Sequence, residues 1–284
     1  MKLTRRKFLK IAGITAVTAL ASHYYLNNEN MKKTPQKPGK ILADIHSHLS
    51  KDNSIEDILK TLSYGLTGLT IWTDNRRIIS YEDAIQYPNV NEIDKGFFAE
   101  ITVGSSKGYF LKTQEISTDH HILAVACKKH IEKYSDARKV VEEIHKHNGL
   151  AILNHPYVIT KEGFIPFRVG NAKDEIRIRE LCEMVDEIEI FNAQNINPTL
   201  GIIIPNMKKA NKKAKNLAKE FGFKGIAASD AHRVLEQSKI SGIYLPEEHI
   251  CLDFIKQNIL SGNFERHEQY VSRWSFIKGM FLSK

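Results

Sequence analysis

ILADIHSH, residues 41–48, is a short apolar strand signal that ends in two histidines. Residues two apart in an extended segment point to the same side, so His46 and His48 can bind one metal ion together. A helix would place the two side chains on different faces. Pairs of histidines at this spacing also occur on surfaces and in cores. The rest of the sequence is therefore needed to distinguish a metal site from a structural pair.

Downstream of this stretch, strand signals alternate with helix signals. Short apolar runs of strand length occupy residues 41–45, 69–72, 122–126, 150–153, 187–191 and 225–228. Amphipathic helices are predicted over residues 54–63, with Ser54 as the N-cap, and over residues 135–147 and 207–221. The basic residues of the third helix are assigned to its solvent-facing side. This alternation predicts an α/β fold with βα units around a parallel sheet or barrel.

Other strand ends also carry nitrogen and oxygen ligands. Glu115 lies in a strand-like segment, His121 precedes a strand, His155 follows one, and Asp230 and His232 follow another. Imidazole with carboxylate suits Zn, Fe or Mn. The three cysteines have no CxxC spacing and are expected to be free and buried, which excludes a thiolate site and a disulfide scaffold. The metal site predicted here is therefore catalytic rather than structural.

Taken in order, these segments resemble the PHP family, named for polymerase and histidinol phosphatase. Its motifs are D-L-H-x-H, T-D-H, G-x-E, H-x-L, A-H-P, I-E-V-x-N and S-D-x-H. The corresponding segments here are DIHSH (44–48), TDN (73–75), QE (114–115), HIL (121–123), NHP (154–156), IEIFN (188–192) and SDAH (229–232). The resemblance covers residues 41 to about 245. It implies a distorted (β/α)7 barrel with two or three divalent metal ions (Zn, Mn or Fe) at the carboxyl ends of the strands.

The resemblance also implies which residues bind metal. A first ion would be held by His46, His48, Glu115 and Asp230, and Glu115 would bridge to a second ion held by His121 and His155. A third ion would use Asp52, the residue at position 75 and His232. Asn75 stands where the family has histidine, and an amide oxygen is a poor ligand for transition metals. Asp52 is also displaced by about one residue from the family's spacing, so a two-metal site or a weak third site is expected.

The activity implied by the resemblance is metal-dependent phosphoester hydrolysis (EC 3.1) on a small phosphorylated substrate. Two ions about 3.5–4 Å apart can activate one water and bind a phosphate oxygen. Glu115, Asp230 and Arg233 are the predicted catalytic residues, with Arg233 and Arg76 binding the substrate because a guanidinium can contact two phosphate oxygens. The neighbouring Arg77 is expected to be a solvated loop charge.

The positive charge of the chain is concentrated at its N-terminus. The 284 residues carry a formal net charge of +8, but residues 1–40 contain nine bases and one acid, which leaves 32 of each in residues 41–284. The remainder is formally neutral, so there is no strong nucleic-acid signal.

The segment TRRKFLK (4–10) resembles the twin-arginine export motif, and residues 11–21 end in an A-x-A cleavage pattern. We expect a signal peptide at 1–21, a flexible linker at 22–40 and a PHP metallohydrolase domain at 41–284. The protein is predicted to be exported by the twin-arginine machinery to the periplasm, cell envelope or exterior. An uncleaved signal anchor stays open, and no other stretch predicts a membrane span.

Three other functions stay open at this point. Related barrel hydrolases cleave amides or carbamates. A TatD-like nuclease also begins with H-x-H-Leu, as residues 46–49 do, although the final histidine of SDAH favours PHP. A non-catalytic envelope protein with a degenerate metal site is the third, and Asn75 is the feature that supports it.

Overall fold

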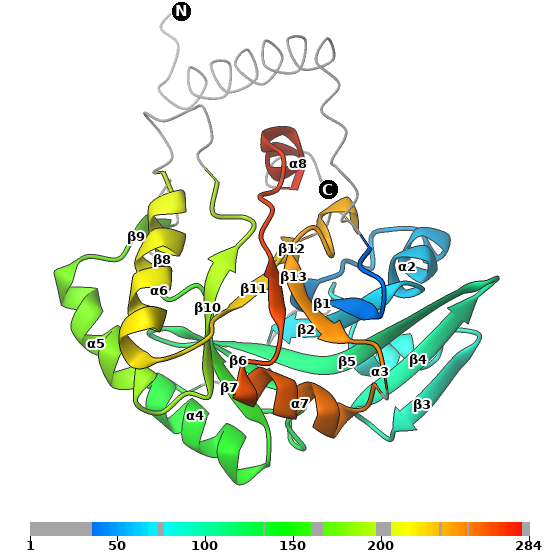
Figure 1. Ribbon diagram of the computed structural model, residues 1–284, viewed down its shortest axis with the longest axis horizontal. Coiled ribbons are helices and arrows are strands. Elements are labelled where there is room, and N and C mark those ends of the chain that lie inside the picture. The colour runs from blue at the N-terminus through cyan, green and yellow to red at the C-terminus, as the bar shows by residue number, and fades with distance from the viewer. Residues whose placement is uncertain are drawn as a thin grey trace, which may run out of the picture.

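The computed structural model describes residues 36–72, 77–132, 134–160, 167–196, 206–232, 235–248 and 250–279. Within them, a twelve-stranded sheet curls into a nearly closed barrel (Figure 1). Seven strands follow one another around it: β1 (Lys40–His48), β2 (Gly65–Trp72), β5 (Ser106–Ser117), β6 (His121–Val125), β7 (Leu150–Leu153), β10 (Glu187–Asn192) and β11 (Ile226–Ala228). The predicted α/β class and distorted seven-stranded barrel are confirmed.

The ring closes through a short strand, β12 (Ala231–His232). It follows β11 by two residues and pairs in parallel with the end of β1, where Ser47 lies opposite Ala231. The backbone N–H of Asp230 also donates to the carbonyl of His46 at 2.9 Å. The first half of β1 instead pairs in antiparallel fashion with β13 (Gly242–Pro246), which in turn pairs with β14 (Glu265–His267). The two ends of the barrel sheet therefore meet beside the histidines of β1.

One barrel strand, β6, runs against the others. β6 pairs antiparallel with both β5 and β7, whereas β1, β2 and β5, and likewise β7, β10 and β11, are parallel. Only three residues separate Ser117 from His121, too few for the crossover that a parallel partner needs. This reversal brings His121, at the start of β6, to the same end of the barrel as the carboxyl ends of its neighbours.

A β-bulge in β1 turns its histidines inward. The register with β2 shifts between Asp44 and Ser47, which interrupts the alternation of side chains between the two faces of the strand. Ile45 packs in the apolar core, and His46, the next residue, lies in the polar cluster at the end of the barrel. At the bulge the backbone of β1 comes close to Gly68, where an added Cβ would lie 2.2 Å from the carbonyl oxygen of Ile45. Glycine at this position permits the close approach of the strands.

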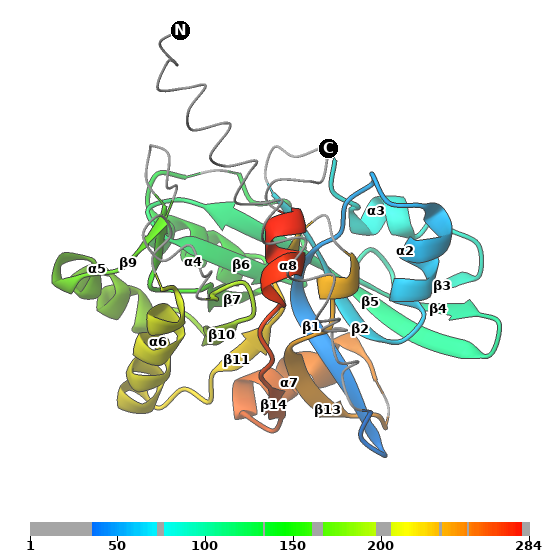
Figure 2. The same cartoon turned by 90° about the horizontal axis from the view of Figure 1, so that it is seen from above.

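Helices cover the outside of the barrel and one end of it. They are α2 (Ile55–Leu62), α3 (Tyr81–Ala84), α4 (Ala137–Lys146), α5 (Ala172–Cys182), α6 (Lys208–Phe221), α7 (Leu252–Ser261) and α8 (Arg273–Ile277), with a 3-10 turn, η1 (Leu235–Gln237). Figures 1 and 2 show α4, α5 and α6 on one side and α2 and α3 on the other. Apolar residues of α7, among them Ile255 and Ile259, pack in the same core as Ile41, Ile152 and Ile226 of the barrel strands.

The three predicted helices are confirmed with small boundary changes, and Ser54 caps α2 by accepting from the N–H of Asp57. The buried residues of α6 are small or apolar apart from one asparagine, and its lysines are exposed or half-buried, as its pattern predicts. Cys127 and Cys182 are free and buried, but the predicted burial is wrong for Cys251, which is exposed at the N-cap of α7.

One hairpin extends the barrel sheet, and a second forms a separate two-stranded sheet. β3 (Val90–Asp94) and β4 (Phe98–Val103) pair in antiparallel fashion and continue onto β5, while β8 (Val158–Thr160) pairs with β9 (Phe167–Val169). None of the helices in the described parts of the chain is long and apolar enough to cross a membrane. The predicted signal peptide and all but the last five residues of the predicted linker lie outside the described residues.

Candidate metal centre

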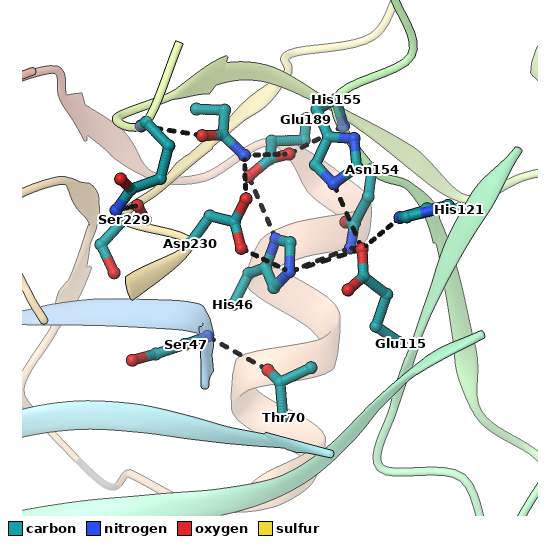
Figure 3. A network of polar contacts seen from close by, with 12 residues as sticks. His46, Ser47, Thr70, Glu115, His121, Asn154, His155, Glu189, Ser229 and Asp230 are labelled. Carbon is teal, nitrogen blue, oxygen red and sulfur yellow. Dashed lines mark hydrogen bonds and ion pairs between the residues drawn. The ribbon is translucent and has the colours of Figure 1, made fainter. Parts of the chain in front are cut away.

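The carboxyl ends of the barrel strands bring most of the predicted metal ligands together. Among the described residues, four overlapping groups have donor atoms within 4.8 Å of one another: His46, His48 and Glu115; His46, His155 and Asp230; Glu115, His121 and His155; and His48, Asp230 and His232. These groups contain seven of the eight residues predicted to bind metal. Figure 3 shows His46 near the middle of the cluster, between Asp230 and Glu115.

The two histidines of β1 point one nitrogen each at the cluster. The Nδ1–H of His46 donates to Oε1 of Glu189 at 3.3 Å, and the Nδ1–H of His48 donates to the carbonyl of Thr70 at 2.9 Å. Each neutral ring then carries its lone pair on Nε2, and the two Nε2 atoms lie 3.2 Å apart. Two such lone pairs would repel each other at this distance, and a shared cation, either a proton on His46 or a metal ion, removes that repulsion. This arrangement is the usual one for histidines that bind metal.

Glu115 lies between two sets of histidines. Its Oε1 is 2.9 Å from Nδ1 of His121 and 3.2 Å from Nε2 of His155, whereas its Oε2 is 3.2 Å from Nε2 of His48. The indole N–H of Trp72 also donates to Oε2, at 2.6 Å. One carboxylate therefore faces two separate groups of nitrogen donors, as a bridging ligand does.

Asp230 supplies an oxygen that has no hydrogen-bond donor in the described part of the structure. Its Oδ1 is buried without such a partner and lies 3.4 Å from Nε2 of His46 and 3.6 Å from Nε2 of His48. Its Oδ2 accepts from Nδ2 of Asn192 at 2.9 Å. An orphaned buried oxygen beside two imidazole lone pairs fits a divalent ion, since imidazole and carboxylate are preferred ligands of Zn, Mn and Fe.

The backbone around Asp230 is held in an unusual conformation. Asp230 has a φ of 49° and His155 a φ of 26°, a region that non-glycine residues rarely adopt. Asp44 stabilises the first of these, because its carboxylate accepts from the N–H and the hydroxyl of Ser229, at 3.0 and 2.5 Å. Strained residues of this kind are concentrated at functional sites.

The pKa shifts in the cluster describe a site that attracts positive charge. Burial lowers the pKa of His48 to about 4. Burial also disfavours a charge on His46, but the carboxylates of Asp230, Glu115 and Glu189 outweigh it and raise the His46 pKa well above its usual value. Burial opposes ionisation of Glu115 and Asp230, yet the surrounding imidazoles lower both pKa values. A divalent ion would supply the charge that these carboxylates draw onto His46.

A cavity of about 520 Å³ opens onto the cluster. Its polar wall includes the amide side chains of Asn192, Gln194, Asn195 and Gln237, and its apolar wall includes Ile78, Val158, Phe167, Met207 and Phe276. Phe276 comes from α8, which Gln237 holds by donating to the carbonyl of Ser275 at 2.8 Å. The described part of segment 274–281, for which the sequence offers no functional interpretation, therefore forms one wall of this cavity.

The remaining predicted residues have different placements. Asp52 is exposed at the cavity and belongs to none of the four donor groups. Arg77 is exposed, as expected, and also lines the cavity. Asn75, Arg76 and Arg233 lie outside the described residues, so their predicted roles stay predictions.

Several contacts of the cluster are not apparent from the motifs. Trp72 contacts Glu115 through its indole N–H, and Nδ2 of Asn154 lies 3.4 Å from Oε1 of Glu115. Glu189 supports His46 and also accepts from the backbone N–H of His155 at 2.7 Å. The position of Trp72 at the end of a predicted strand was the one available signal for the first of these contacts.

Comparison with known proteins agrees with the motifs. Residues 208–236, which include Asp230 and His232, match the family model described as PHP-associated. The predicted resemblance to the PHP family is confirmed by this match. None of the curated proteins matches the chain.

Three solved structures are similar in fold to this chain. One is a two-domain protein from Bacteroides vulgatus containing a predicted PHP-like metal-dependent phosphoesterase, with 13% identity over 90% of this chain and 74% of that one, at a TM-score of 0.48. The lesion-specific endonuclease EndoQ from Pyrococcus furiosus has 14% identity over 80% of this chain and 57% of its own, at 0.45. Endonuclease Q in complex with a 27-mer duplex has 13% identity over 80% of this chain and 58% of its own, at a TM-score of 0.43. This chain thus spans less than two thirds of the length of the two endonuclease chains.

Proposed function

We propose that this chain is an exported, metal-dependent phosphoesterase that hydrolyses a small phosphorylated substrate. The observation that carries the proposal is the position of Glu115, whose two oxygens face separate sets of imidazole nitrogens around one cavity. When bound, a pair of divalent ions would lower the pKa of a water molecule and neutralise charge on a phosphoryl group.

The donor atoms divide into two ion positions. His46, His48 and Asp230 would hold one Zn, Mn or Fe ion, His121 and His155 the other, and Glu115 would contact both.

A third ion would have few donors left. In the group of His48, Asp230 and His232, the Nδ1 of His48 is already committed to the Thr70 carbonyl, and Oδ2 of Asp230 to Asn192. Nδ1 of His232 is 2.6 Å from the carbonyl oxygen of Asp230. We therefore favour two ions over three.

The chain's own residues would bind and orient the substrate. Arg77 supplies a cation at the cavity. Arg76, which precedes Arg77, and Arg233, which follows His232, are proposed to contact the phosphate. The apolar wall of the cavity offers contact with the rest of the molecule, whereas the amide nitrogens of its polar wall already donate to protein oxygens. These features favour a small phosphate ester.

The first experiment offers Mn²⁺- or Zn²⁺-loaded protein a phosphomonoester, a phosphodiester, single-stranded DNA and an aryl carbamate. We expect turnover of a phosphate ester, and loss of it in Glu115→Gln. His145→Ala is the matched control, because His145 is an exposed α4 residue paired with Asp186 at 2.9 Å. Turnover of the carbamate alone would make the protein an amide or carbamate hydrolase. Less than one equivalent of bound metal, with no turnover, would favour a non-catalytic envelope protein.

Export is proposed on the twin-arginine motif at Arg5 and Arg6. The test replaces both arginines with lysine and follows the protein in cell fractions of a bacterial host. We expect the original chain outside the cytoplasmic membrane and the variant inside it. Equal distribution of the two forms would contradict export by this route.

A further inference from the structure

Trp72 contacts three of the residues that surround the proposed ions. Its indole N–H donates to Oε2 of Glu115 at 2.6 Å. Its ring stacks on His48, with centroids 4.3 Å apart and planes 30° apart, and packs against His232 at 5.1 Å and 42°. The side chain is partly exposed and lines the cavity.

The backbone places Trp72 where these contacts are possible. Trp72 ends β2 and lies directly opposite Glu115 in the parallel pairing with β5. His48 ends β1, the next strand along the sheet, and its Nδ1–H donates to Thr70, two residues before Trp72. The indole therefore lies between the ends of strands that supply one nitrogen and one oxygen ligand.

We propose that Trp72 is a positioning residue of the metal centre, which fixes the carboxylate of Glu115 and the ring of His48 for metal binding. This inference rests on the metal site of the proposed function. It does not depend on which substrate is hydrolysed.

Glu115 would keep only some of its contacts once ions are bound. Three of its partners are the imidazole nitrogens of His121, His155 and His48, at 2.9 to 3.2 Å, and these nitrogens would turn to the ions. An indole N–H is a donor only and cannot ligate a metal. The hydrogen bond from Trp72 therefore remains, and it is charge-assisted because the acceptor is a carboxylate.

This hydrogen bond would fix the rotation of the Glu115 carboxylate. Glu115 is buried, and to contact both ions its plane has to direct Oε1 toward His121 and His155 and Oε2 toward His48. A donor fixed on Oε2 sets that rotation, as outer hydrogen bonds do for metal-binding carboxylates. Stacking of the same indole on His48 fixes the second ring.

The alternative is that Trp72 forms only part of the cavity wall. A wall residue contacts substrate, so its replacement would change KM and leave the affinity for metal unchanged. A positioning residue changes metal affinity in the absence of any substrate. Calorimetric titration with Zn²⁺ alone separates these two cases.

Trp72→Phe keeps an aromatic ring beside His48 and removes the N–H. We expect its Zn²⁺ affinity to fall by about 10–100-fold, the usual effect of losing an outer hydrogen bond to a metal ligand. Trp274→Phe is the matched control, because Trp274 is the second of the two tryptophans, in α8, and we expect it to bind Zn²⁺ like the original protein. Unchanged affinity in Trp72→Phe would overturn the proposal.

Fluorescence gives a second measurement that does not depend on the folding of the Trp72 variant. Trp274→Phe leaves Trp72 as the only tryptophan, next to the proposed ions. We expect its emission to change on Zn²⁺ addition and to saturate at the concentrations found by calorimetry. Emission that stays constant while Zn²⁺ binds would contradict the contact with the metal centre.

The two proposals fail in different ways. Tight Zn²⁺ binding with a loss in Trp72→Phe, but no hydrolysis of any ester, would support the role of Trp72 and refute the phosphoesterase. Hydrolysis by the original protein with equal Zn²⁺ affinity in Trp72→Phe would refute the role of Trp72 alone. Absence of Zn²⁺ binding by the original protein would refute both.

Discussion

Replacing Glu187 with glutamine should change how the stability of this protein depends on pH. Glu187 begins β10 and is 2% exposed. Burial raises the pKa of its carboxyl from 4.5 to about 7, although Oε1 accepts from the N–H groups of Ile188 and Gly225, at 2.8 and 3.1 Å. Between pH 4.5 and 7 the folded chain therefore holds a proton that the unfolded chain has lost. The free energy of unfolding falls as the pH rises through this window.

The size of this change in stability follows from the pKa shift of Glu187. One pKa unit corresponds to 1.36 kcal/mol, so a shift of about 2.5 units costs the folded state about 3 kcal/mol above pH 7. Glutamine has nearly the same shape, retains an acceptor oxygen and does not ionise. Relative to the original protein, Glu187→Gln should therefore gain up to about 3 kcal/mol of stability between pH 4.5 and pH 8.

The assay is urea unfolding of both proteins at pH 4.5 and pH 8. Comparing the same pair at two pH values cancels any cost of burying the glutamine amide, because that cost does not depend on pH. Glu183→Gln is the control, since Glu183 is exposed at the end of α5 and should show no such gain. A stability difference between Glu187→Gln and the original protein that is the same at both pH values would refute the reasoning.

Three further results are expected. Glu189→Gln loses one of the two acceptors that hold His46 and the backbone of His155, so calorimetry should record a 10–100-fold loss of metal affinity. Gly68→Ala should lower the free energy of unfolding by about 3 kcal/mol or more, because its Cβ would lie 2.2 Å from the Ile45 carbonyl oxygen. Thermal unfolding should show this as a lower melting temperature. Removing metal with a chelator should lower the melting temperature and adding Zn²⁺ should restore it, because ligands that bind only the folded state stabilise it.

The parts of the site that the sequence predicts are those set by local geometry. His46 and His48 share a side because they are two apart in a strand, and Glu115, His155 and Asp230 meet because parallel strands end together. The role of these residues as metal ligands still depends on the resemblance and on the donor geometry.

Other parts of the fold depend on pairings between distant segments. The contact of Trp72 with Glu115 requires the register of β2 on β5, 43 residues apart, and no local pattern specifies that register. The closure of the barrel by β12 on β1 is likewise a contact between residues far apart in the chain.

Some signals were present but not used. Asn171 and Asp174 form a capping box at the start of α5, a helix that apolar periodicity alone did not predict. The three residues between β5 and β6 already excluded a parallel connection, which would have predicted the reversal of β6. Both features, a helix cap and a short connection, indicate local structure where the hydrophobic pattern is weak.

The charge of the chain bears on how the proposed site would attract phosphate. Residues 41–284 are formally neutral, and the described cavity wall contains the carboxylates of Asp52, Glu115 and Asp230 but a single arginine, Arg77. Without ions these carboxylates repel a phosphate, whereas two divalent ions add four positive charges at the same place. The proposed function therefore requires metal to bind before substrate, and it makes metal occupancy, not the overall basic composition, the condition for phosphate binding.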